Sequence, residues 1–81
     1  MSEAYKKIIR EIKRKMFTRG MNIRMTAEAL RCHRVNLSQY LNLRVAMRAD
    51  LMLKAIDYFD IDMNQVLGIP HVVTNLGGDA E

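Results

Sequence analysis

The stretch RCHRVNLSQYLN, residues 31–42, combines two kinds of side chain at short spacing. Its arginine, asparagine, serine and glutamine side chains donate and accept hydrogen bonds. Its apolar residues Leu37, Tyr40 and Leu41 share one face if the segment is helical. The pattern predicts a helix that is buried on one side and offers polar groups to a hydrogen-bonding surface with its other side.

An all-α domain is predicted to position this segment. The 81 residues suffice for one domain, and four glycines and one proline, Pro70, leave few helix breakers. Ser2, Asn22 and Asp62 are expected to cap helices, while Gly20 and Gly68 are expected to end them. We expect five helices, at about 3–19, 23–31, 34–41, 48–59 and 63–67.

Apolar residues recur at helical spacing in the other predicted helices and define their inward faces. They are Tyr5, Ile8, Ile9, Ile12 and Met16; Ile23, Ala27 and Leu30; and Leu51, Met52, Ala55, Ile56 and Phe59. The second and third helices are short and are joined by about three or four residues, the spacing of a helix-turn-helix unit. The small Ala27 would let these two helices approach closely, and Leu37 would fill the space between them.

Charge is unevenly distributed along the chain. Residues 1–54 hold all 13 basic residues and four acidic ones, a net charge of +9, whereas residues 55–81 hold five acidic residues and no lysine or arginine. This separation favours a polyanionic partner for the first part of the chain over an ordinary solvated charged surface.

The segment TAEALRCHRVNLSQYL resembles the helix-turn-helix of lambda-repressor-like domains, which include phage repressors and related antitoxins. The stretch MRADLMLKAIDYFDIDMNQVL resembles the last two helices of that family. The resemblance implies a compact five-helix bundle and a DNA-binding domain over 1–69. The residues from Pro70 onward, 70–81, are expected to form a flexible tail. Arg31 departs from the family's turn glycine, at a position that favours a left-handed backbone. Thr26 replaces a larger apolar residue, and Leu41 stands where many members carry glutamate.

The resemblance implies that Arg34, Val35 and Gln39 read bases, with Asn36 facing either bases or solvent. Arg34 suits guanine O6 and N7, Gln39 suits adenine N6 and N7, and the Val35 methyls suit thymine methyl groups. The alternative for Val35 is that it packs on the second helix.

The sugar–phosphate backbone is the expected partner of a second group of residues: Arg24, Ser38, Asn42, Arg44 and Arg48. The resemblance implies this role for Asn42, and Arg44 and Arg48 follow it closely in the sequence. Arg24 falls in the first turn of the second helix, and Ser38 is expected at the edge of the groove. For the arginines the alternative is a solvated charge without a partner.

A homodimer on double-stranded DNA is also expected, because the fifth helix forms the dimer contact in many relatives. Its interface would contain Ile61, Met63, Val66, Leu67 and Ile69. It would hold two recognition helices for half-sites roughly 34 Å apart, in a palindromic operator. The alternative is that these residues only complete the core of the monomer.

We therefore predict a small transcriptional repressor. The alternatives are an autoregulating antitoxin that binds a toxin, a regulator that touches polymerase, and a protein-interaction module that has lost DNA binding. No nucleophile–base pair, carboxylate pair or metal-ligand set stands out, so we expect no catalytic residue, cofactor or metal. The lone Cys32 fits a reducing cytoplasm, and we find no signal peptide and no apolar run long enough to span a membrane.

Overall fold

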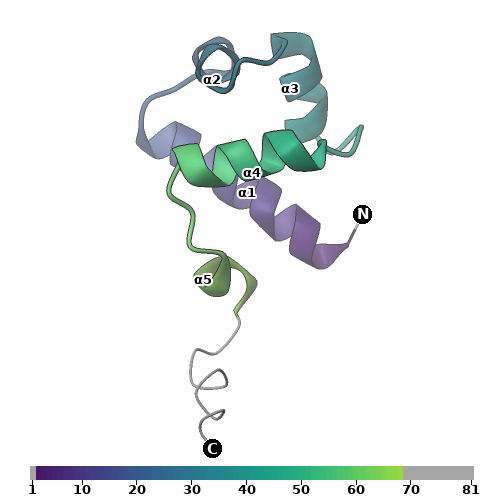
Figure 1. Ribbon diagram of the computed structural model, residues 1–81, viewed down its shortest axis with the longest axis vertical. Coiled ribbons are helices and arrows are strands. Elements are labelled where there is room, and N and C mark those ends of the chain that lie inside the picture. The colour runs from purple at the N-terminus through teal and green to yellow at the C-terminus, as the bar shows by residue number, and fades with distance from the viewer. Residues whose placement is uncertain (1, 69–81) are drawn as a thin grey trace, which may run out of the picture.

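The computed structural model describes residues 2–68, which form five α-helices and contain no strand (Figure 1). The helices are α1 (Glu3–Thr18), α2 (Ile23–Leu30), α3 (Arg34–Leu41), α4 (Ala49–Tyr58) and α5 (Met63–Leu67). The all-α class is confirmed, and the predicted bounds hold to within about one residue. Ile69 and the predicted tail, 70–81, lie outside the described residues.

The three predicted N-caps are confirmed. Ser2 Oγ accepts a hydrogen bond from the backbone N–H of Tyr5 (3.1 Å), and Asn22 Oδ1 accepts one from that of Met25 (2.8 Å). Asp62 Oδ1 accepts one from the backbone N–H of Asn64 (3.0 Å). Each cap satisfies a donor that the first helical turn would leave unpaired.

Four helices end in a left-handed residue followed by a tight backbone hydrogen bond. The left-handed residues are Gly20, Arg31, Leu43 and Asp60, with φ of 67°, 58°, 60° and 53°. The N–H of the next residue bonds to the carbonyl five residues back, at 2.8–2.9 Å, in the Schellman arrangement. The left-handed backbone expected at Arg31 is present, although no glycine occupies the position.

The core is built from the predicted inward faces of α1 to α4. The buried apolar residues are Ile8, Ile9, Ile12, Met16, Ala27, Leu30, Leu37, Tyr40, Leu41, Met47, Leu51, Ala55, Phe59 and Ile61. Ile23, Met52 and Ile56 were also expected to face inward, but they are only half-buried at the edge of the core. Thr26 is fully buried, and its hydroxyl donates to the carbonyl oxygen of Asn22 (2.9 Å), which explains how this core position tolerates a polar residue.

Packing of the helices separates α3 from α5. α2 packs on α3, α1 contacts both α3 and α5, and α4 contacts α2. In Figure 1, α4 crosses α1, and α3 and α5 lie at opposite ends of the described part of the molecule. None of the helices within residues 2–68 has the combination of length and hydropathy needed to cross a membrane.

Candidate nucleic-acid interface

α3 is buried on one side and exposed on the other. Leu37, Tyr40 and Leu41 face the core, whereas Arg34, Val35 and Gln39 are exposed. Val35 is 55% exposed and lines the same surface as Ile23 of α2, so about half of its side chain is open to solvent. A branched apolar side chain this open to solvent is available for contact with another molecule.

Six of the nine residues predicted to contact DNA line one open surface depression, with a volume of about 490 Å³. We call it the α3 groove, and it is lined by Ile23, Arg34, Val35, Ser38, Gln39, Asn42 and Arg44. Three of the four residues predicted to read bases, Arg34, Val35 and Gln39, thus lie beside three of the predicted backbone contacts. Two cations, two amides and a hydroxyl surround apolar side chains there, a mixture that suits base edges and phosphates together.

Local hydrogen bonds fix the residues of the α3 groove that lie at the C-terminal end of α3. Asn42 Nδ2 donates to Ser38 Oγ (3.4 Å), and the backbone N–H of Arg44 donates to the carbonyl oxygen of Gln39 (2.9 Å). The second bond belongs to the left-handed turn at Leu43. Arg44 is therefore fixed directly after the helix instead of being carried on a free loop.

Asn36, Arg24 and Arg48 do not line the α3 groove. Asn36 lies on the opposite flank of α3, where it lines a different cavity with Arg48. Arg24 Nε lies 3.8 Å from Glu28 Oε2, and Arg48 Nε lies 3.5 Å from Asp50 Oδ1. These ion pairs are largely exposed and contribute little to stability, so either arginine can leave its carboxylate for a phosphate.

Sequence reasoning did not identify Ile23, Leu43 or Val45 as apolar residues with exposed surface. Ile23 lines the α3 groove, and Leu43 and Val45, near Arg44, are 36% and 45% exposed. Ile23 was assigned to the core from helical periodicity; it is half-buried against that core and also lines the α3 groove. Leu43 and Val45 lie in a connection without periodicity, so no inward face could be assigned to them.

The residues predicted to form a dimer contact lie at or near α5. Ile61 is only 7% exposed and belongs to the core of the single chain, so it is not available for a dimer contact. Met63, Val66 and Leu67 are half-buried against that core and keep part of their surface exposed. Ile69 lies outside the described residues.

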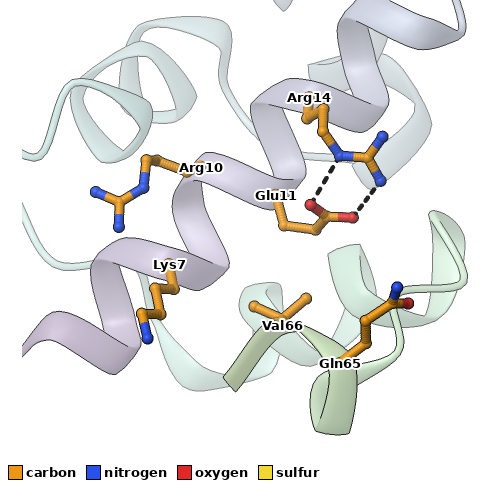
Figure 2. Close-up of a pocket in the computed structure, with 6 residues that line it drawn as sticks. All are labelled: Lys7, Arg10, Glu11, Arg14, Gln65 and Val66. Atoms are coloured by element: carbon orange, nitrogen blue, oxygen red, sulfur yellow. Dashed lines mark hydrogen bonds and ion pairs between the residues drawn. The ribbon is translucent and has the colours of Figure 1, made fainter. Parts of the chain in front are cut away.

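A surface cavity with basic residues in its wall lies between α1 and α5, beside the region where the two helices pack together. Figure 2 shows Lys7, Arg10, Glu11 and Arg14 projecting from α1, with Gln65 and Val66 of α5 completing the wall. Arg14 Nε donates to Glu11 Oε1 (2.9 Å) and Arg14 Nη2 to Glu11 Oε2 (2.6 Å), a bidentate pair. The hydrogen bonds from Arg14 lower the pKa of the Glu11 carboxyl, which outweighs the opposing effect of burial.

Cys32 lies in the turn between α2 and α3 and is half-buried. Burial raises the pKa of its thiol, although the nearby charge of Lys54 lowers it in part. The thiol is therefore protonated at neutral pH, a form that is a poor nucleophile and a poor metal ligand. Within residues 2–68, no three histidine, cysteine, aspartate or glutamate side chains gather in a way that would hold a metal ion.

No protein-family model matches this chain, and neither a curated protein nor a solved structure matches it. Function is therefore inferred from the surface chemistry of the described residues.

Proposed function

We propose that this protein is a sequence-specific, double-stranded DNA-binding transcriptional regulator, with the repressor role as the leading assignment. In this proposal α2 and α3 form a helix-turn-helix of the lambda-repressor-like type, and α3 enters the major groove with its N-terminal end first. The observation that carries the proposal is the α3 groove, which brings Arg34, Val35 and Gln39 together with Asn42 and Arg44 on one exposed surface.

Base recognition is assigned to three side chains. Arg34 is suited to guanine O6 and N7, and Gln39 is suited to adenine N6 and N7, each through two hydrogen bonds. The exposed methyls of Val35 suit a thymine methyl group. Each good bidentate pair discriminates against a wrong base by roughly 1–3 kcal/mol. Asn36 is left out of the reading set because it lies on the other flank of α3.

Contacts with the sugar–phosphate backbone, which give affinity without sequence preference, are assigned to the residues at the C-terminal end of α3. Asn42 and Ser38 offer neutral hydrogen bonds to phosphate oxygens, and Arg44 adds a positive charge beside them. Arg24 and Arg48 are weaker candidates for phosphate contacts, because each must first give up an exposed ion pair.

Two copies are proposed to act together. The partly exposed side chains of Met63, Val66 and Leu67 are the remaining candidates for the contact between them. Two recognition helices about one helical turn apart would read a palindromic operator. Sedimentation of the protein with and without duplex DNA measures this directly.

Selection of bound sites from a random duplex library tests the proposal. We expect enrichment of a short consensus, repeated as an inverted repeat if two copies bind. Arg34→Ala should relax the preference at one position, whereas Lys13→Ala, which removes an exposed α1 charge outside the α3 groove, should leave the consensus unchanged. A library that stays random after selection would contradict sequence-specific recognition.

A protein-interaction module is the second candidate, favoured by the exposed apolar side chains of Val35, Leu43 and Val45. The dependence of binding on salt separates the two candidates. Neutralisation of phosphates makes affinity fall steeply as salt rises, whereas an apolar protein contact responds far less.

A further inference from the structure

A second cavity lies on the flank of α3 that faces away from Val35 and Asn42. We call it the turn pocket, and it has a volume of about 290 Å³. The α2–α3 turn contributes Arg31 and His33, α3 contributes Asn36 and Tyr40, and the start and middle of α4 contribute Arg48 and Lys54. Three separate elements therefore meet around a space large enough for a small molecule and several waters.

Positive charge dominates the wall of the turn pocket. Arg31, Arg48 and Lys54 bring three cations, and Asp50 is the one carboxylate among the lining residues. Asp50 engages Arg48 only through Nε, at 3.5 Å, and both side chains are largely exposed. The other four N–H donors of the guanidinium remain available to a ligand.

Lys54 is held in position at the pocket. Its Nζ donates to the carbonyl oxygen of Leu30 at 3.0 Å, where the C-terminal end of α2 leaves carbonyls without helical partners. An ammonium carries three donors, so two remain for a further acceptor. The lysine is thus anchored next to the pocket instead of moving freely in solvent.

Tyr40 supplies the second, independent observation. Its side chain is nine-tenths buried, with 9% exposure, and it lines the turn pocket. Its hydroxyl makes no hydrogen bond to any other residue of 2–68, whereas the hydroxyl of the half-buried Tyr5 accepts one from the backbone N–H of Met47 at 2.7 Å. A hydroxyl in the wall of a cavity, without a partner among these residues, is available to donate a hydrogen bond to a group that occupies the cavity.

We propose that the turn pocket binds a small anion bearing a carboxylate or phosphate group, held by Arg31, Lys54 and the Tyr40 hydroxyl. The three cations supply the charge, and the Tyr40 hydroxyl supplies a hydrogen-bond donor. Metal cations do not fit, since one carboxylate faces three positive charges.

The bound anion would regulate DNA binding, a consequence that rests on the proposed function. It would place negative charge beside Arg48, a proposed phosphate contact, and next to His33, which occupies the N-cap position of α3. Like charges then oppose the approach of DNA phosphates, and affinity for the operator falls.

The direct test is a DNA-free titration with inorganic phosphate at constant ionic strength, followed by amide chemical shifts in NMR. We expect saturable shifts at His33, Asn36 and Lys54. Tyr40→Phe and Arg31→Gly should each weaken phosphate binding about tenfold, the size of one lost hydrogen bond to a charged group. Arg31→Gly suits the left-handed backbone, so the turn remains intact.

Lys13→Ala is the matched control, because it also removes one positive charge but lies outside the turn pocket. Shifts that do not saturate, or that Lys13→Ala weakens as much as Arg31→Gly does, would overturn the proposal and indicate general attraction to a basic surface. Random duplex DNA forms the second arm of the experiment. If duplex DNA occupies the pocket in a way that depends on Tyr40, the site is part of the DNA interface and the small-anion proposal is wrong.

The readout without DNA keeps this proposal separate from the proposed function. Saturable phosphate binding would support the turn pocket as an anion site even if selection from random duplex DNA enriched no consensus, a result that would refute sequence-specific DNA binding. A successful selection together with no saturable phosphate binding would support the DNA-binding role and refute the turn pocket as an anion site.

Discussion

The phenolic oxygen of Tyr5 accepts a hydrogen bond from the backbone N–H of Met47 at 2.7 Å. This bond joins the first turn of α1 to the connection between α3 and α4, two segments 42 residues apart in the chain. Arg44 and Val45 lie in the same connection, so the bond helps to hold the far end of the α3 groove. Sequence periodicity assigned Tyr5 to the core but did not identify the role of its hydroxyl.

Tyr5→Phe is expected to lower the free energy of unfolding by about 1–3 kcal/mol, because the partly buried N–H of Met47 loses its acceptor. Urea denaturation measures the change. Tyr58→Phe is the matched control, since Tyr58 is 41% exposed and its hydroxyl bonds to no other residue of 2–68. Equal effects of the two substitutions would show that the Tyr5–Met47 bond contributes nothing specific.

Arg34→Ala is expected to weaken operator binding by roughly 1–3 kcal/mol and to relax the preference at one base pair, because a bidentate contact to one guanine is lost. Binding to a panel of operators, each changed at a single position, measures both effects. If every operator weakens equally and the ranking of bases is unchanged, Arg34 contacts phosphate and the base-reading role is refuted.

Arg44→Ala is expected to weaken binding to operator and random DNA alike. The slope of log affinity against log salt should become shallower by about one, since one phosphate neutralisation is lost. Lys13→Ala serves as the control of equal charge and should leave the slope as it is. An unaltered slope in Arg44→Ala would remove this residue from the DNA interface.

Leu43→Gly is expected to raise the free energy of unfolding by about 0.5–1 kcal/mol, because Leu43 has φ of 60° and glycine adopts that conformation without a steric penalty. Thermal denaturation measures the gain. Asn42→Gly, one residue earlier with φ of −91°, should show no such gain. Destabilisation by Leu43→Gly would mean that contacts of the leucine side chain outweigh the backbone strain.

Glu11 gives a prediction for pH. Its pKa is lowered from the ordinary value of 4.5, chiefly by hydrogen bonds from Arg14, so the folded state favours the ionised carboxylate. The resulting stability is present at neutral pH and is lost as the pH falls through the folded pKa. Glu11→Gln should therefore be less stable than the unsubstituted protein at neutral pH, and the difference should vanish as the pH falls below the folded pKa of Glu11. A difference that persists at the lower pH would point to packing instead of charge.

The helices were predictable because local signals and periodicity agree along most of the chain. Ser2, Asn22 and Asp62 cap where their side chains predict, and the apolar stripe of α1 is buried as expected. The left-handed residues Leu43 and Asp60 were not foreseen, because leucine disfavours that conformation and aspartate adopts it only occasionally. The chain adopts it there to complete the helix ends, and only the packed fold compensates the strain.

The sequence predicted most of the residues of the candidate site, but it did not predict correctly on which side of α3 each of them lies. Arg34, Val35 and Gln39 share one surface because helical spacing brings them together. Asn36 was grouped with them by its nearness in sequence, yet a step of about 100° around the helix turns it to the other flank. The turn pocket depends on Arg31 and Lys54, which meet only when α4 packs on α2, and no local pattern reveals such a contact.

α3 has eight residues, too few for a helix to persist on its own in water. The arrangement of Arg34, Val35 and Gln39 therefore exists only while Leu37, Tyr40 and Leu41 are seated in the core. When heat unfolds the bundle, this arrangement of side chains is lost in the same cooperative step. An unfolded chain therefore does not retain it. If α3 reads DNA as proposed, that binding should be lost as the protein passes through the midpoint of its thermal unfolding.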